Sequence, residues 1–107
     1  MPVLTGIAER ERVLDSLRRM SPELRRRGLR HLRMFGSAAR GEADAGSDID
    51  LIAELDRTGS RMSLLDLMGI EADLSDRLGR KVEIATSPEQ MRPRVRARVD
   101  ADAVLVY

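Results

Sequence analysis

Asp48 and Asp50 stand at the head of an apolar run and are separated by a single residue. In a β-strand alternate side chains point to one face, so both carboxylates would lie on the same side, with Cα atoms about 7 Å apart. Magnesium prefers oxygen ligands and typically takes one or two protein carboxylates together with phosphates and water. Glu83 has the same phase in a later strand-like segment, so it could add a third carboxylate to a magnesium site.

A Gly-Ser pair, Gly36 and Ser37, precedes these carboxylates and opens a helix-compatible segment over residues 38–43. A backbone without a bulky side chain can approach phosphate oxygens, and the positive end of the helix would favour an anion there. Arg40, one turn later, could be a further phosphate ligand. Together the turn and the carboxylates predict a magnesium–nucleotide site. Such a site suits nucleotidyl transfer, which needs a held triphosphate, divalent cations and an aligned acceptor hydroxyl.

Each of these features also has a purely structural interpretation. Paired aspartates often cap a turn, a Gly-Ser pair is often a plain turn, and Arg40 or Glu83 alone would be an ordinary exposed residue. The functional interpretation is favoured because turn, spacing, strand phase and third carboxylate agree in one chain.

Helical periodicity predicts the elements that hold these residues in place. The apolar spacing indicates a helix over residues 7–20 and another over residues 64–78, where the apolar stripe is expected to be core. Ser63-x-x-Asp66 resembles a capping box at the start of the second helix, Gly79 would end it, and Gly69 inside it is expected to mark close packing. Shorter helices are predicted to start at the N-caps Ser21 and Ser87, with a break or restart at Pro93.

Strands are predicted over residues 29–35, 48–55 and 81–86, with a short final strand over residues 103–107. In the second strand Ile49, Leu51 and Ala53 would face the core, and Asp48, Asp50 and Ile52 the opposite side. The third strand would bury Val82 and Ile84 and leave Glu83 on the carboxylate side.

Composition bounds the class of protein. The chain has 107 residues, 42% of them hydrophobic, which predicts one compact domain over residues 1–107. A net charge of +1 does not call for nucleic acid, so no direct nucleic-acid binding is expected. The sequence has no cysteine and shows no secretory signal or membrane-spanning run, which predicts a cytoplasmic protein. The sequence has two arginine clusters: Arg25, Arg26, Arg27, Arg30 and Arg33, and Arg92, Arg94, Arg96 and Arg98. The default interpretation is that they form solvated surfaces, and the minority interpretation is that they bind RNA or an acidic partner.

The central motif resembles that of a known family. Gly-Ser-Ala-Ala-Arg-Gly over residues 36–41, followed by Ser-Asp-Ile-Asp-Leu over residues 47–51, is similar to the signature of the minimal nucleotidyltransferases of the DNA polymerase beta superfamily. The resemblance extends to Gly-Arg-Lys-Val-Glu-Ile over residues 79–84, where the family usually shows a strand with the third carboxylate. It implies an α/β (α+β) nucleotidyltransferase fold with a small mixed sheet packed against helices.

The resemblance also implies roles for individual residues. Asp48, Asp50 and Glu83 would be catalytic and would hold Mg²⁺, while ATP would be bound by Gly36, Ser37, Arg40 and Ser47. The family more often has aspartate at the third position. The extra methylene of Glu83 moves the carboxylate by about a bond length, which affects its alignment.

Single-domain members of the family resemble the antitoxin half of two-gene toxin–antitoxin systems. The resemblance implies a hetero-oligomer with a helical HEPN-domain ribonuclease toxin, to whose tyrosine hydroxyl the enzyme would transfer AMP from ATP. Two alternatives remain open: a catalytically impaired antitoxin that neutralises its toxin by stable binding, which the Glu83 departure favours, and a small-molecule, antibiotic-type nucleotidyltransferase completed by dimerisation.

Overall fold

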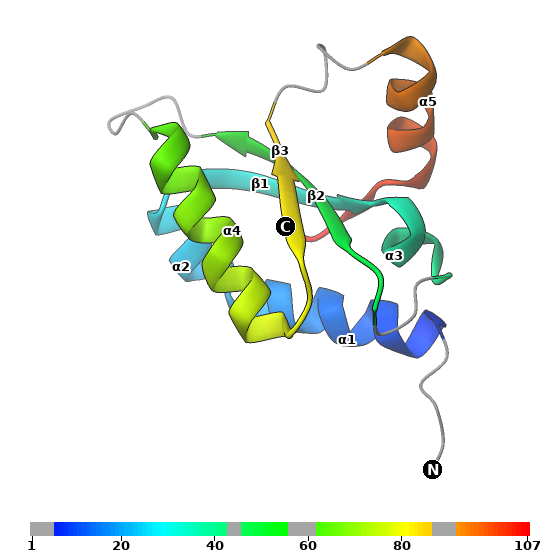
Figure 1. The fold of residues 1–107 in the computed structure, drawn as a ribbon, viewed down its shortest axis with the longest axis horizontal. Coiled ribbons are helices and arrows are strands. Elements are labelled where there is room, and N and C mark those ends of the chain that lie inside the picture. The colour runs from blue at the N-terminus through cyan, green and yellow to red at the C-terminus, as the bar shows by residue number, and fades with distance from the viewer. Residues whose placement is uncertain (1–5, 43–45, 56–61, 87–91) are drawn as a thin grey trace.

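A mixed four-stranded sheet forms the centre of the computed structural model, which describes residues 6–42, 46–55, 62–86 and 92–107 (Figure 1). The strand order is β3-β2-β1-β4. β1 is antiparallel to both β2 and β4, whereas β2 and β3 are parallel. The mixed sheet implied by the family resemblance is therefore confirmed; its strands are β1 (Leu29–Phe35), β2 (Ile49–Leu55), β3 (Val82–Ala85) and β4 (Val104–Leu105).

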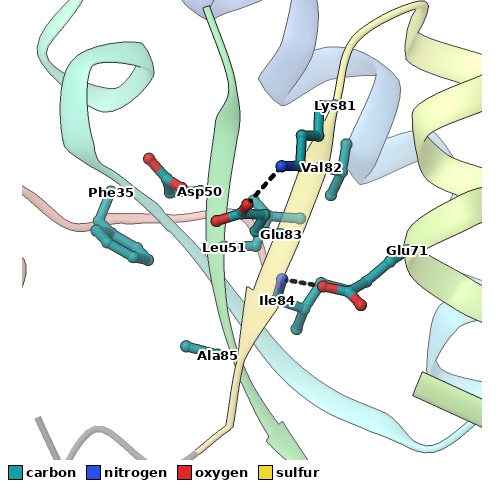
Figure 2. Close-up of a pocket in the computed structure, with 9 residues that line it drawn as sticks. All are labelled: Phe35, Asp50, Leu51, Glu71, Lys81, Val82, Glu83, Ile84 and Ala85. Carbon is teal, nitrogen blue, oxygen red and sulfur yellow. Dashed lines mark hydrogen bonds and ion pairs between the residues drawn. The ribbon is translucent and has the colours of Figure 1, made fainter. Parts of the chain in front are cut away.

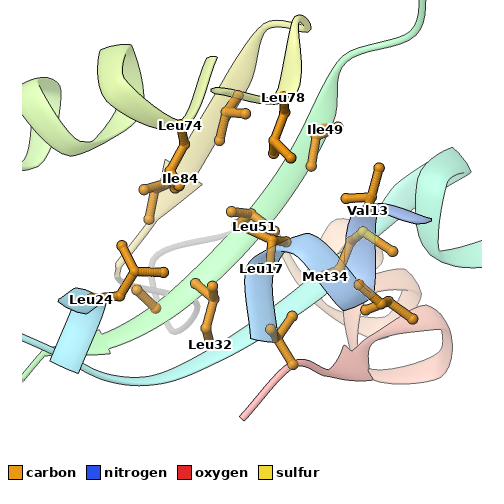
Figure 3. Packing of buried hydrophobic residues seen from close by; sticks show 14 of the residues in the cluster. Val13, Leu17, Leu24, Leu32, Met34, Ile49, Leu51, Leu74, Leu78 and Ile84 are labelled. Atoms are coloured by element: carbon orange, nitrogen blue, oxygen red, sulfur yellow. The ribbon is translucent and has the colours of Figure 1, made fainter. Parts of the chain in front are cut away.

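Helices α1 (Gly6–Arg19), α2 (Ser21–Arg26) and α4 (Leu64–Leu78) supply most of the helical side of the core, and α3 (Gly36–Arg40) and α5 (Pro93–Asp102) complete the order along the chain. One cluster of buried side chains joins α1, α2 and α4 to the sheet (Figure 3). In β2 the alternation is as predicted, because Ile49, Leu51 and Ala53 belong to this cluster and Asp50 does not. In the described segments no helix is both long and apolar enough to cross a bilayer.

Helix α4 begins with the predicted capping box. The Ser63 hydroxyl accepts a hydrogen bond from the Asp66 amide at 3.1 Å, and the Asp66 carboxylate accepts one from the Ser63 amide at 2.9 Å. Gly79 ends the helix in the left-handed conformation, with a φ of 67°. These local signals fix the position of α4 along the chain, and hence the start of β3 after it.

The prediction that the apolar stripe of α4 is core is wrong for Leu64 and for the adjacent Leu65 and Met68, whereas Leu67 packs against the core as predicted. Leu64, Leu65 and Met68 are 72, 78 and 52% exposed, whereas Ile70 and Leu74 are buried. At about 100° per residue the two groups point to different sides of the helix, and only the second faces the sheet. The expected close packing at Gly69 is also wrong, because no described atom lies within 4 Å of a Cβ built there.

Several predicted boundaries are shifted. Met20 rather than Ser21 occupies the N-cap of α2, and it makes no side-chain capping bond. The helix predicted over residues 38–43 instead spans Gly36–Arg40, and the final strand has only two residues. The predicted restart at Pro93 is confirmed as the first residue of α5, while the predicted cap at Ser87 lies outside the described residues.

Candidate active site

Asp50 and Glu83 are brought together by the pairing of β2 with β3. The two residues are register partners on these parallel strands, and adjacent strands lie about 4.8 Å apart. Both side chains leave the sheet on the face away from the core and line one pocket. Figure 2 shows this pocket between β3 and the end of β1. The residues that line it are Phe35, Asp50, Leu51, Glu71, Lys81, Val82, Glu83, Ile84 and Ala85.

Asp50 carries an electrostatic signature of this arrangement. Burial raises the pKa of the half-buried Asp50 carboxyl above its usual value, and the nearby negative charges of Glu83 and Asp48 raise it further. Like charges that act on one another in this way are stabilised by a cation placed among them. All three are oxygen donors, so the donor set fits the preference of magnesium.

The three carboxylates do not form a closed ligand cluster in this conformation. Among the described residues no group of three acidic, histidine or cysteine side chains converges closely enough to hold a metal ion. The Glu83 carboxylate instead forms an ion pair with the Lys81 ammonium group at 3.1 Å, which is drawn in Figure 2. Asp48 is exposed and lies one residue before β2, so the predicted start of that strand is one residue early. Asp48, Asp50 and Glu83 remain the predicted ligands of a magnesium ion, which when bound would neutralise charge on a nucleotide's phosphates.

Gly36 lies directly against Asp50. Its φ of 75° is in the left-handed region, and a Cβ built on it would meet the Asp50 carboxylate oxygen at 2.9 Å. The site thus depends on glycine both for backbone conformation and for space. Ser37 follows in the first turn of α3, where backbone amides lack intrahelical partners and can bind an anion.

Arg40 makes contacts other than those expected of a phosphate ligand. Its guanidinium pairs with Glu42 at 3.0 Å and with Asp102 of α5 at 2.8 Å, and these bonds raise the pKa of Arg40. It does not line the pocket around Asp50. In this conformation Arg40 joins α3 to α5, and its nucleotide-binding role stays a prediction.

Ser47, also predicted to bind the nucleotide, has its backbone carbonyl held by a side chain that the sequence did not single out. The guanidinium of Arg80 donates to the Ser47 carbonyl oxygen and to the Glu9 carboxylate. Glu9 lies on α1, 71 positions away from Arg80. No local pattern in the sequence pairs residues so far apart.

Two residues of the pocket are not predicted as site residues by the sequence, because each one alone fits an ordinary position in a strand or a helix. Lys81 begins the predicted third strand, and its ammonium group pairs with Glu83, which is the main cause of its raised pKa. Glu71 lies inside the helix predicted over residues 64–78, and its carboxylate accepts a hydrogen bond from the Ile84 amide at 2.7 Å. The hydroxyl of Ser75 accepts one from the Val82 amide at 3.0 Å, so α4 fixes the position of β3 and therefore the direction of Glu83.

Comparison with known proteins agrees with this geometry. The family model described as the nucleotidyltransferase domain matches residues 11–106. The chain therefore belongs to the nucleotidyltransferase domain family, and it is a nucleotidyltransferase. A Methanocaldococcus jannaschii protein, MJ0435, named as a candidate protein adenylyltransferase, is 34% identical over 87 residues, which are 81% of this chain and 89% of that protein.

Solved structures place the chain among the minimal members of the family. The structure of a candidate minimal nucleotidyltransferase has a TM-score of 0.65 and 34% identity, and the match covers 85% of this chain and 93% of that one. A complex of a tri-AMPylated Shewanella oneidensis HEPN toxin with an MNT antitoxin gives a TM-score of 0.61 with 92 and 71% coverage. At 13% identity this second match shows likeness of fold alone. The predicted resemblance to minimal nucleotidyltransferases is confirmed.

Proposed function

We propose that this protein is a cytoplasmic, Mg²⁺-dependent adenylyltransferase antitoxin that transfers AMP from ATP to a tyrosine hydroxyl of a HEPN-family ribonuclease toxin. The observation that carries the proposal is the register pair of Asp50 and Glu83 in one pocket, with Gly36 against Asp50. The pair supplies carboxylates for a cation, and the glycine turn supplies backbone amides for a phosphate.

The transfer is a displacement at the α-phosphorus of ATP. The tyrosine oxygen forms the new bond to phosphorus, the bond to the bridging oxygen breaks, and pyrophosphate leaves. The tyrosine proton must pass to a base, and a carboxylate oxygen of Asp50 that the cation leaves free could accept it. Glu83, beside Asp50, is the alternative acceptor.

A protein acceptor is supported by the curated relatives and by the pocket. MJ0435 and a second M. jannaschii relative, which is 30% identical over 94% of its own length, are both named as candidate protein adenylyltransferases. The pocket lies on strands at one side of the sheet and includes exposed residues, Lys81 and Glu83 among them, so a side chain of another protein can reach it. The toxin partner and a hetero-oligomer with it are part of the proposal, and they are supported by the fold that this chain shares with the antitoxin of that complex.

The proposal is tested by incubating the protein with labelled ATP, magnesium and the purified product of the adjacent gene, and then measuring label on that product. We expect label to move from the α-phosphate of ATP to the partner, with the mass of one AMP added per modified tyrosine. Asp50→Asn should abolish the label. Glu54→Gln is the matched control, because Glu54 lies on the same face of β2 but is exposed and outside the pocket. Transfer by the Asp50→Asn variant at the rate of the Glu54→Gln variant would sink the proposal.

A second candidate function is neutralisation of the partner by stable binding, with catalysis dispensable. The ion pair of Glu83 with Lys81 favours it, because in this conformation the third carboxylate binds a lysine and, among the described residues, does not converge with the other two. In that case the double variant Asp48→Ala, Asp50→Ala would still suppress the toxicity of the partner, and the mass of the partner would not change.

A further inference from the structure

Arg80 is a buried cation beside the loop that leads into the candidate site. Its side chain is 3% exposed, and that of its ion-pair partner Glu9 is 8% exposed. Among the described residues these two are the only buried charged ones. A buried charge is costly unless it is paired and hydrogen-bonded, so a pair kept in the interior calls for a reason beyond stability.

The contacts of Arg80 are directed at the loop before Asp48. Its Nε and Nη2 atoms donate to the backbone carbonyl oxygen of Ser47 at 2.9 and 2.6 Å, while Nη1 donates to Glu9 at 2.7 Å. Two donors on one oxygen and a third on a carboxylate use the planar fork of a guanidinium, which a lysine cannot reproduce.

A second contact holds the other side of Asp48. The amide of Ile49 donates to the Lys81 carbonyl oxygen at 2.8 Å. The residues on both sides of Asp48 are thus tied to consecutive residues, Arg80 and Lys81, of the segment that leads into Glu83. The backbone that carries one predicted metal ligand is fixed to the backbone that carries another.

We infer that Arg80 is a positioning residue for the metal site: it fixes the Ser47 carbonyl, and through it the direction of the Asp48 carboxylate relative to Asp50 and Glu83. Glu9 holds the guanidinium in place and so connects α1 to the site. The inference rests on the magnesium–nucleotide site of the proposed function, but it does not depend on which acceptor receives the nucleotide.

A single Arg80 variant would be ambiguous, because the buried Glu9 would keep only its ion pair with Arg12 and the loss of the Arg80 pair would itself destabilise the fold. The double variant Glu9→Leu, Arg80→Met removes both buried charges and replaces them with apolar side chains, which often preserves stability. It also removes both hydrogen bonds from Arg80 to the Ser47 carbonyl oxygen. Arg77→Met is the control, because Arg77 is an exposed residue of α4 that pairs with Glu23 of α2 and with Asp73, and it does not line the pocket.

Binding of Mn²⁺ in the presence of a non-hydrolysable ATP analogue, followed by electron paramagnetic resonance, is the readout, with thermal unfolding measured on the same samples. We expect Mn²⁺ affinity to fall about 10- to 100-fold in the double variant, as is typical when partners that orient metal ligands are lost. Arg80→Lys should lose less, Arg77→Met should bind as the parent does, and the double variant should unfold near the parent's temperature.

The outcomes separate this inference from the proposed function. Parent-like Mn²⁺ affinity in a stable double variant would overturn the positioning role and leave Arg80 with a structural one. Absence of Mn²⁺ binding to the parent would overturn both this inference and the proposed function. Weakened binding in the double variant, together with a parent that labels no protein acceptor, would support the positioning role and overturn only the proposed acceptor.

Discussion

Asp50 and Glu83 are register partners on two parallel strands, and burial together with the negative charge of Glu83 raises the pKa of Asp50. Such a pair is unfavourable for a protein that has no use for it, because two carboxylates on neighbouring strands repel each other. The repulsion is relieved when a cation or a proton lies between them. The pair therefore makes the site sensitive both to pH and to divalent metal.

The stability contributed by Asp50 should fall as the pH rises. Because its pKa is raised in the folded state, the folded protein binds this proton more tightly than the unfolded chain does. The contribution is fully present below the ordinary carboxyl pKa and is lost as the pH rises through the raised value. Urea unfolding of the parent and of Asp50→Asn across this window should show the free-energy difference shifting in favour of the variant. Addition of Mg²⁺ should reverse the shift, and a difference that is flat with pH would contradict the prediction.

Glu83→Gln should reduce nucleotidyl transfer by about 100-fold, since loss of a well-placed charged group or a misplacement of about 1 Å costs this much. Glu83→Asp, which introduces the residue more frequent in the family, should keep transfer within about tenfold of the parent. Steady-state transfer rates with labelled ATP, measured for the parent and for both variants, check these two expectations. Equal rates for parent and Glu83→Gln would show that Glu83 is not a ligand.

Gly36→Ala should impair both folding and nucleotide binding. Gly36 and Gly79 both have left-handed backbones, where alanine costs about 1–2 kcal/mol, but only at Gly36 would the new Cβ meet a carboxylate. Gly79→Ala is therefore the matched control. Both variants should lower the free energy of unfolding by a similar amount, and only Gly36→Ala should also weaken binding of Mg²⁺ and ATP in calorimetry. Equal binding by both variants would remove Gly36 from the site.

Two leucines of α4 should respond differently to truncation. Leu74→Ala creates a cavity in the core and should cost about 2–5 kcal/mol of unfolding free energy. Leu65→Ala, on the exposed side of the same helix, should change the free energy of unfolding by no more than about 0.5 kcal/mol. Denaturant titrations of the two variants measure the difference. A large loss at Leu65 would mean that something covers this side of α4 in solution.

Tyr107, the only tyrosine, gives a direct optical check of the packing at the chain's end. Burial raises its pKa to about 12, and its hydroxyl donates to the Leu29 carbonyl oxygen at 2.9 Å. Tyrosinate absorbance should therefore titrate about two units later than in the unfolded chain, and the associated stability should be lost between these values as the pH rises. Tyr107→Phe should cost about 1 kcal/mol, the worth of one hydrogen bond. Titration near pH 10 in the folded protein would contradict the contact.

The parts of the structure that were predictable depend on local rules. The alternation of β2, the phase of Glu83 and the capping box at Ser63 follow from residues within a few positions of one another. The family signature adds how these segments come together. It provides the mixed sheet, which the pattern of a single strand cannot specify.

The parts that were not predictable depend on contacts between distant segments. Arg40 reaches Asp102 across 62 positions, and Arg80 reaches Glu9 across 71. Neither pair has a periodic signal, because each is decided by which elements the completed fold brings side by side. The exposed half of α4 was misassigned for a related reason: its sequence has two apolar sides, and only packing decides which one is buried.

The hydrogen bonds from β3 to α4 also bear on how this protein behaves at high concentration. β3 is an outer strand of the sheet, and an outer strand with free amides can recruit a strand from another molecule. Here Ser75 and Glu71 occupy the outward amides of Val82 and Ile84. The opposite margin is closed by a strand of only two residues, Val104–Leu105. Both margins of the sheet are thus poor templates for chain-to-chain strand addition, so the protein should resist aggregation by this route.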